Sequence, residues 1–154
     1  MPCVERGLTV LTLPGAEEAS SDPCDTGSDV EVLKSEFPDV DLSNVHGEWF
    51  VHSGLYATTP EALSARAKEL RRFVRSRKEK EVVLVSHGFF NHYLTGDVNE
   101  KGEQTTGWWR EAEIRTFTFE SENDGDAKIK ETQESVDLRI KEAESEELAK
   151  RGLN

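Results

Sequence analysis

The sequence is short of basic residues and has no long apolar run, and both shortages exclude broad classes of protein. Nineteen Lys and Arg residues stand against thirty-one Asp and Glu residues, which gives a formal net charge of −12. So acidic a chain is a poor partner for nucleic acid or for an anionic membrane. No apolar stretch approaches a membrane span, and residues 8–13 are too short and poorly flanked for a signal peptide. We therefore expect an intracellular, cytoplasmic protein, in which a small phosphate ester is still an acceptable ligand.

Cysteine and histidine are also scarce. The two cysteines, Cys3 and Cys24, are best interpreted as free thiols in a reducing compartment. None of the histidines has the i, i+4 partner or the neighbouring cysteine that a zinc site requires. The four histidines are His46, His52, His87 and His92. The sequence thus predicts neither a metal site nor a cofactor.

One stretch has both a buried-strand pattern and a titratable side chain at its end. Val82-Val83-Leu84-Val85-Ser86 is an unbroken apolar run after a charged segment, which is typical of a parallel strand covered on both faces. The period then changes, because Phe89 with Tyr93 and Phe90 with Leu94 are i, i+4 pairs, and Gly96 can end a short helix. His87 therefore lies at the carboxyl end of a strand and beside the N–H groups of a helix start, where open α/β sheets bind anions.

The rest of the chain predicts a single small α/β domain without internal repeats. Thr59-Pro60-Glu61 begins a helix whose apolar residues, Leu63 to Val74, recur every three or four positions. The basic residues near its end fit a solvated helix end better than an anion patch. The other predicted elements are strands at residues 8–13 and 113–119, a helix at about 29–37 begun by the Ser28/Glu31 capping-box spacing, and a charged helix at 131–151. Three strands make a small sheet, and the strand at 82–86 lacks neighbours on its edges.

The residues alone leave the chemistry open. Ser86 and His87 are adjacent, so on a strand their side chains point to opposite faces and do not form a nucleophile–base pair. Taken alone, His87 fits a structural strand-end histidine as well as a functional one. We interpret His46 and His52 as surface or packing residues, and His92 as a structural hydrogen-bonding residue.

Several blocks together resemble one known family. The run from Val82 to Thr95, with its Ser-His-Gly, is similar to the second-histidine motif of the histidine phosphatase superfamily, in particular its phosphoglycerate-mutase-like branch in fungi. Further blocks keep the family's order between about residue 6 and about residue 120. They are Leu13-Pro14 to Glu18, Pro23-Cys24-Asp25-Thr26-Gly27-Ser28-Asp29, Thr59-Pro60-Glu61-Ala62-Leu63, Thr106-Gly107-Trp108 and Glu113-Ile114-Arg115-Thr116-Phe117.

The resemblance implies a fold and a reaction. Members of the family fold as a three-layer α/β/α sandwich and hydrolyse or transfer phosphoryl groups of small phosphorylated substrates through a phosphohistidine, without metal. By this resemblance His87 is the second active-site histidine, which donates to the phosphoryl oxygens, and Gly88 and Phe89 lie beside the phosphate. Phe89 stands where the family commonly has a second glycine and would narrow that pocket. Glu18 matches the acid that protonates the leaving oxygen, and Glu17 is the alternative acid.

The departure from the family is large. Its nucleophile lies in an Arg-His-Gly motif after the first strand, and these 154 residues contain no Arg-His-Gly. We therefore expect a histidine-phosphatase-like domain at residues 1–130 that is incomplete at its N-terminus, followed by a charged helix or tail at 131–154. Three accounts are open: an incomplete gene prediction for a working phosphatase, a short remnant that binds a phosphate ligand or a protein, or a chain that completes its sheet with a partner. An unpaired sheet edge favours self-association.

Overall fold

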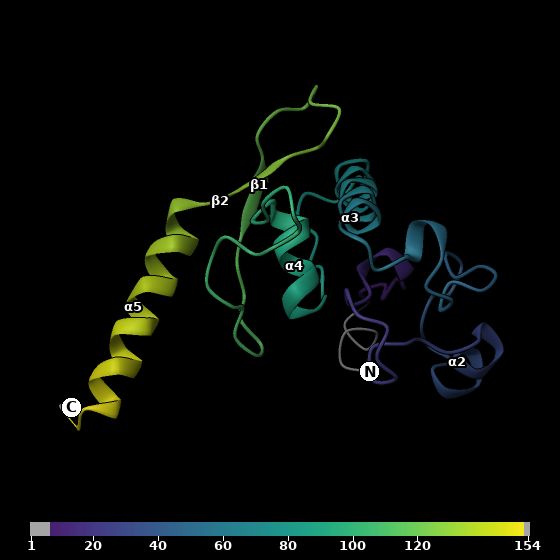
Figure 1. The fold of residues 1–154 in the computed structure, drawn as a ribbon, viewed down its shortest axis with the longest axis horizontal. Helices are drawn as coiled ribbons and strands as arrows, with labels where there is room; N and C mark the ends of the chain where they lie inside the picture. The colour runs from purple at the N-terminus through teal and green to yellow at the C-terminus, as the bar shows by residue number, and fades with distance from the viewer. Residues whose placement is uncertain (1–6, 153–154) are drawn as a thin grey trace.

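A computed structural model describes residues 7–152 as a mixed α/β structure with a very small sheet (Figure 1). Its α-helices are α2 (Val30–Glu36), α3 (Pro60–Arg75), α4 (Gly88–Thr95) and α5 (Gln133–Lys150). Two 3₁₀ turns, η1 (Pro14–Ala16) and η2 (Gly54–Tyr56), and two strands, β1 (Phe117–Phe119) and β2 (Ile129–Glu131), complete the described elements. None of the helices in these residues has the length and apolarity needed to span a membrane. The α/β class is confirmed, but two paired strands do not by themselves make a three-layer sandwich.

The core lies between α3 and α4. The predicted stripe on α3 is buried at Leu63, Ala67 and Leu70, and it packs against apolar residues of α4 and of the η1 turn. Thr59 caps α3 by accepting a hydrogen bond from the backbone N–H of Ala62, as the Thr-Pro-Glu start predicted. Because so much of the core belongs to these two helices, their packing determines where the start of α4 lies.

Helix α4 forms as the change of period predicted. It begins directly after His87 and ends at Gly96, whose φ of 80° is the left-handed conformation that a glycine adopts easily at a helix end. Its buried face carries Phe90, Tyr93 and Leu94. The hydroxyl of Tyr93 donates to the backbone carbonyl of Gly102, which ties the loop after α4 back onto the helix.

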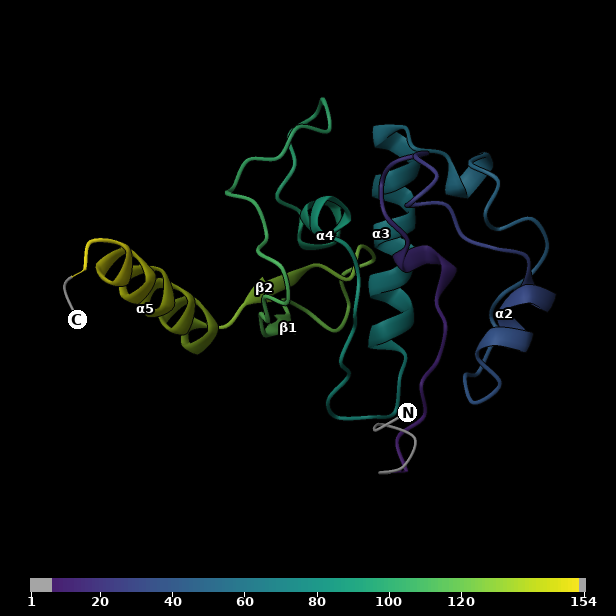
Figure 2. The ribbon, with the colours of Figure 1, turned by 90° about the horizontal axis from the view of Figure 1, so that it is seen from below.

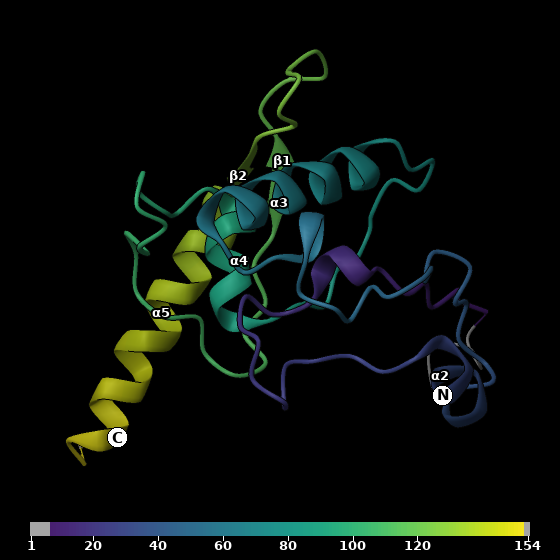
Figure 3. The same cartoon turned by 45° about the vertical axis from the view of Figure 1, so that its right-hand side comes forward.

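The two strands predicted upstream do not pair into a sheet, and this corrects the sequence-based prediction. Residues 82–86 are extended but unpaired, and Val83 and Val85 are 91% and 84% exposed instead of buried. Residues 8–13 make a single parallel bridge, from Leu11 to Asp41. In Figures 2 and 3 the segment between α3 and α4 is drawn as a coil and not as a strand arrow. A strand needs a hydrogen-bonded neighbour, and among residues 7–152 none reaches this one.

The arginines near the end of α3 bind a loop, where the sequence predicted a solvated helix end. Arg71 donates to the carbonyl of Asp126, Arg72 to that of Gly125, and Arg75 to those of Ser121 and Asp124. Guanidinium groups suit this task because each presents several donors in a fixed plane. The arginines therefore hold the turn between β1 and β2 against α3.

The C-terminal third is a two-stranded hairpin followed by a projecting helix. Only the last three residues of the predicted strand at 113–119 pair, as β1, with the antiparallel β2, which the sequence did not predict. Helix α5 begins after Thr132, as expected within two residues, and extends away from the other helices (Figure 1). Arg110 donates to Glu142 and Glu146 of α5, so charged contacts hold its middle.

Helix α2 lies on the opposite side of α3 from α5 (Figures 1 and 2). Its cap is Asp29, which accepts from the N–H of Glu31, one residue later than the capping box predicted from Ser28. Trp49 packs on Gly27 so closely that a Cβ there would lie 2.0 Å from its ring, and its indole N–H donates to the carbonyl of Ser28. Only glycine fits at position 27, because any side chain there would clash with the ring of Trp49.

Candidate functional site at the start of helix α4

The carboxylate of Glu18 lies on the N-terminal amides of α4, immediately after His87. One oxygen accepts from the backbone N–H of Phe90 at 2.9 Å and of Ala19 at 2.8 Å, and the other accepts from the N–H of Phe89 at 3.3 Å. The N–H groups of Phe89 and Phe90 have no partner inside the helix, and the positive end of the helix dipole favours a negative charge there. The structure therefore brings together two residues that the sequence separates widely, Glu18 and the helix start at His87.

Arg66 positions the turn that carries Glu18. Its guanidinium is 1% exposed, donates to the Glu17 carboxylate at 2.6 Å, and donates to the backbone carbonyls of Glu17 and Glu18 at 3.0 Å each. The same guanidinium lies over the ring of Phe90, 4.4 Å from its centroid. Arg66 thus joins α3, the Glu17-Glu18 turn and α4 in one contact, which fixes where the Glu18 carboxylate lies relative to the helix start.

Glu17 is a buried acid with an unusual protonation equilibrium. Burial raises the pKa of Glu17 to about 7, although the attraction of Arg66 opposes the rise. One carboxylate oxygen is bonded to Arg66, and the other is buried without a hydrogen-bond partner among the described residues. Near neutral pH, therefore, Glu17 is divided between its protonated and ionised forms.

His87 is exposed and lies at one end of a groove. The groove has a volume of about 270 Å³ and is lined by His87, Glu17 and Leu84 together with residues from the N-terminal segment and Trp49. The N–H of Gly88 has no acceptor within residues 7–152, and the space beside its Cα is open. An anion placed against α4 would therefore meet the imidazole of His87 and the free N–H of Gly88.

Ser86 and Phe89 have structural contacts. The hydroxyl of Ser86 donates to the carbonyl of Ala16 at 2.7 Å, which fastens the end of the extended segment to the η1 turn. The ring of Phe89 packs against Tyr93 and Trp108, with centroids 5.8 Å and 6.0 Å away. Phe89 is not among the residues that line the groove beside His87.

The other histidines are placed as packing or surface residues. His92 is fully buried, with Nδ1 3.3 Å from the hydroxyl of Thr106, and burial lowers the pKa of His92. His52 lies 3.2 Å from the hydroxyl of Thr26. In residues 7–152 no three His, Cys, Asp or Glu side chains come together in a way that could hold a metal ion. The thiol of Cys24 is free and exposed, whereas Cys3 lies outside the described residues.

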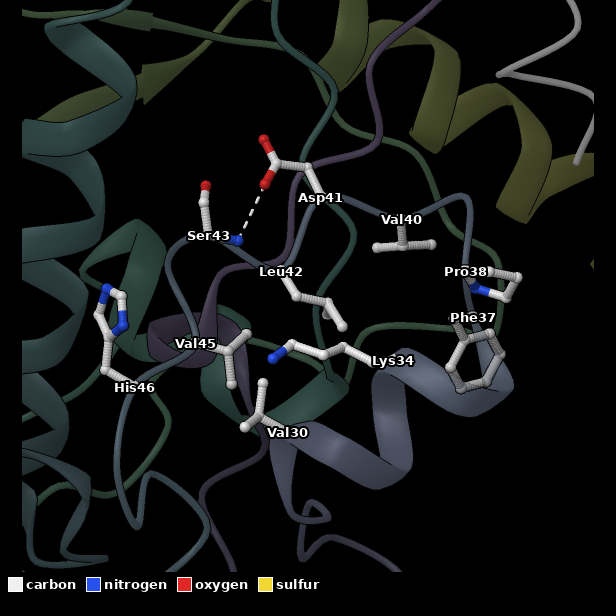
Figure 4. Close-up of a pocket in the computed structure, with 10 residues that line it drawn as sticks. All are labelled: Val30, Lys34, Phe37, Pro38, Val40, Asp41, Leu42, Ser43, Val45 and His46. Atoms are coloured by element: carbon white, nitrogen blue, oxygen red, sulfur yellow. Dashed lines mark hydrogen bonds between the residues drawn. The ribbon is translucent and has the colours of Figure 1, made fainter.

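A second, larger hollow lies between α2 and the loop after it (Figure 4). Its volume is about 580 Å³, its walls are mainly apolar, and Val45 lines both this hollow and the groove beside His87. Lys34, at its edge, is already paired with Glu31. Hydrogen bonds from the hydroxyl and then from the backbone N–H of Ser43 lower the pKa of Asp41. The charged side chains that line the hollow, Lys34 and Asp41, are thus already engaged within the chain, and His46 lines it as an exposed side chain.

Two curated proteins of Arabidopsis thaliana match part of the chain. A "Phosphoglycerate mutase-like protein" is 33% identical over 82 residues, which are 51% of this chain and 29% of that protein. A "Phosphoglycerate mutase-like protein 1" is 35% identical over 83 residues, which are 51% of this chain and 28% of that protein. The matched part is thus less than a third of each relative.

These two matches support a relation to the broad phosphoglycerate-mutase-like family. No protein-family model matches the chain. No solved structure matches it either.

Sequence reasoning identified His87 and Glu18 but missed Arg66. A signal for it was present, because Arg66 stands three residues after Leu63 and directly before Ala67, within the apolar stripe of α3. An arginine on the buried face of an amphipathic helix must find an acid or carbonyls inside the protein. In the structure Arg66 finds the Glu17 carboxylate and the carbonyls of Glu17 and Glu18.

Proposed function

We propose that this chain carries one half of a phosphoryl-transfer site of the phosphoglycerate-mutase-like, fungal type, and that this half binds small phosphomonoesters in the cytoplasm. In this proposal residues 1–130 are part of a three-layer α/β/α sandwich and residues 131–154 are an appended helix or tail. His87 and the free N–H of Gly88 bind the phosphoryl oxygens, and the N–H of Phe89 joins them when Glu18 moves off it. Glu18 is the acid that protonates the leaving oxygen. The free, exposed Cys24 is compatible with a reducing compartment.

The observation that carries the proposal is the contact between Glu18 and α4. A carboxylate that comes from 71 residues upstream of Phe89 binds the N-terminal amides of the helix that begins after His87. In-line phosphoryl displacement needs donors on the equatorial oxygens and an acid near the departing oxygen. His87 and the free N–H of Gly88 supply the donors, and Glu18 supplies the acid beside them.

A catalytic acid needs both a suitable pKa and a position beside the leaving oxygen, and each of the two neighbouring glutamates meets one of these requirements. Glu17 has the pKa near 7 that suits proton transfer at neutral pH, but its carboxylate is paired with buried Arg66. Glu18 lies against the helix start, where the phosphoryl group is proposed to bind. We assign the acid to Glu18 on this position, and we assign Glu17 to holding Arg66.

The proposal predicts binding without turnover for residues 1–154. The purified chain is expected to bind phenyl phosphate in calorimetric titration, but to release no phenol without metal and to acquire no acid-labile phosphohistidine. The physical reason is that these residues lack the Arg-His-Gly nucleophile. His87→Ala should abolish the binding, whereas His46→Ala, a change at an exposed histidine away from α4, should leave it unchanged.

Two outcomes would change this account. Metal-independent turnover that His87→Ala abolishes would show that the chain has a complete site by itself. Absence of any phenyl phosphate binding would remove the phosphate site altogether. Mapping the 5′ end of the transcript distinguishes an incomplete gene prediction from a short remnant. An upstream in-frame exon that encodes Arg-His-Gly would restore the complete enzyme.

A further inference from the structure

The backbone amides that would bind a phosphoryl group at the start of α4 are in part occupied by the chain's own carboxylate. Glu18 accepts from the N–H of Phe90 at 2.9 Å and from that of Phe89 at 3.3 Å. The N–H of Gly88, by contrast, has no acceptor within residues 7–152. Carboxylate and phosphoryl oxygens are both anionic acceptors that bind the N–H groups of a helix start. A phosphoryl group and Glu18 therefore compete for the amides of Phe89 and Phe90.

The side chain of Glu18 can leave α4 without disturbing the turn that carries it. Arg66 holds this turn through the backbone carbonyls of Glu17 and Glu18, and not through the Glu18 carboxylate. The bond to Phe89, at 3.3 Å, is longer than the usual N–H···O bond. Glu18 is half-buried, and it also accepts at 2.8 Å from the N–H of Ala19, the next residue of the same turn. A displaced carboxylate would thus still have a donor and access to water.

A buried acid beside Glu18 also lacks a complete set of partners. The side chain of Glu17 is 6% exposed, and its Oε2 has no hydrogen-bond partner among the described residues. Glu17 also lines the groove that is lined by His87. Buried polar atoms are nearly always satisfied, so an unpaired oxygen on a groove wall indicates a place where a ligand or water completes the site. This observation does not depend on α4, and it concerns the same groove.

We propose, on the basis of the function proposed above, that Glu18 is an internal competitor of the phosphoryl group. In the free chain its carboxylate closes the amides of Phe89 and Phe90, and a bound phosphoryl group displaces it. The phosphoryl group then has the three adjacent N–H groups of residues 88–90 together with the imidazole of His87. The displaced Glu18 stays beside the ligand, where an acid for the leaving oxygen is needed.

Displacement places the Glu18 carboxylate next to a group that is itself negatively charged. Two like charges side by side favour the uptake of a proton from solvent by one of them. The other charged and titratable groups around Glu18 are Glu17 in its own turn, Arg66 from α3, and His87 and His92 from the α4 segment. All of them are present in the free chain as well, so the charge of the phosphoryl group is what changes on binding. Binding should therefore load Glu18 with the proton that the leaving oxygen requires.

Calorimetric titration with phenyl phosphate at pH 7.5 tests the competition. Glu18→Gln removes the competing charge and keeps the size of the side chain, so it should bind about tenfold more tightly than the wild type. Glu18→Ala, which frees both amides outright, should bind at least as tightly as Glu18→Gln. The matched control is Glu36→Gln, the same change at an exposed residue at the end of α2, which should leave the affinity within about twofold of the wild type. Circular dichroism should show that all three variants keep their helices.

Titration in two buffers with different ionisation enthalpies measures the protons taken up on binding. The wild type should take up more protons per phenyl phosphate than Glu18→Gln does. The ligand, the histidines and Glu17 are common to both proteins, so the difference belongs to Glu18.

The possible results distinguish the internal competitor from the phosphate site itself. If the proteins bind phenyl phosphate but Glu18→Gln and Glu18→Ala bind no more tightly than Glu36→Gln, Glu18 is not a competitor, although the phosphate site stands. Equal proton uptake by the wild type and Glu18→Gln would show that Glu18 gains no proton on binding. If neither the wild type nor any variant binds phenyl phosphate, the phosphate site is ruled out, and the internal competitor with it.

Discussion

Arg66→Met lowers the free energy of unfolding by about 3–5 kcal/mol at pH 8, the loss expected when one partner of a buried ion pair is removed. The side chain of Arg66 is 1% exposed and that of Glu17 is 6% exposed, so the substitution leaves Glu17 buried without its partner, and Glu17 must either take up a proton or stay there as an unpaired charge. The change also removes the hydrogen bonds to the carbonyls of Glu17 and Glu18 and the contact with the ring of Phe90. Methionine is chosen because it fills a similar volume without a charge. Urea unfolding followed by circular dichroism measures the loss.

An exposed ion pair provides the matched control. Lys34→Met breaks the pair between Lys34 and Glu31, whose side chains are 55% and 74% exposed, and should cost no more than about 0.5 kcal/mol. The double variant Arg66→Met with Glu17→Gln should recover part of the stability lost by Arg66→Met, because it leaves no buried charge. If Arg66→Met cost as little as Lys34→Met, Arg66 would not be the group that holds the Glu17-Glu18 turn.

The second large effect is a fall in stability as the pH rises between about 5 and 8. Burial raises the pKa of Glu17 from 4.5 to about 7, so the folded protein binds this proton more tightly than the unfolded chain does. The stabilisation from the bound proton is fully present below pH 4.5 and is lost as the pH rises through 7. The corresponding change in the free energy of unfolding is on the order of 3 kcal/mol.

Urea unfolding at a series of pH values checks this dependence. Glu17→Gln should remove it, because glutamine does not titrate and its side-chain oxygen can still accept from Arg66. The comparison between the two proteins isolates Glu17 from the surface carboxylates, which both proteins share. Parallel curves for the wild type and Glu17→Gln between pH 5 and 8 would contradict the raised pKa.

The helices were predictable from the sequence because their signals are local. The apolar stripe and the Thr59 cap of α3, and the i, i+4 pairs and Gly96 of α4, each lie within the helix that they specify. The strands were not predictable in the same way, because a strand exists only with its neighbour. The run at 82–86 has the composition of a buried strand and yet is exposed, since the described residues supply nothing to pair with it.

The candidate site was only partly predictable for a similar reason. The resemblance of the Ser-His-Gly block to the family motif pointed to His87, and the block from Leu13-Pro14 to Glu18, in its place in the family's order, pointed to Glu18. Neither block indicated that Glu18 binds the N–H groups of Phe89 and Phe90. That contact depends on Arg66 and on the packing of α3 against α4, which are long-range features. The same holds for the arginines at the end of α3, whose acceptors are carbonyls about fifty residues away in the sequence.

The most direct test of the proposed phosphate site is a titration of the ¹⁵N-labelled chain with phenyl phosphate, followed amide by amide by NMR. The account predicts saturable shifts concentrated at the backbone amides of Gly88, Phe89 and Phe90, absent in His87→Ala and unchanged in His46→Ala. Shifts confined to the hollow beside α2, or no saturable shift at any amide of α4, would contradict the claim that His87, Glu18 and the start of α4 form a phosphate-binding half-site.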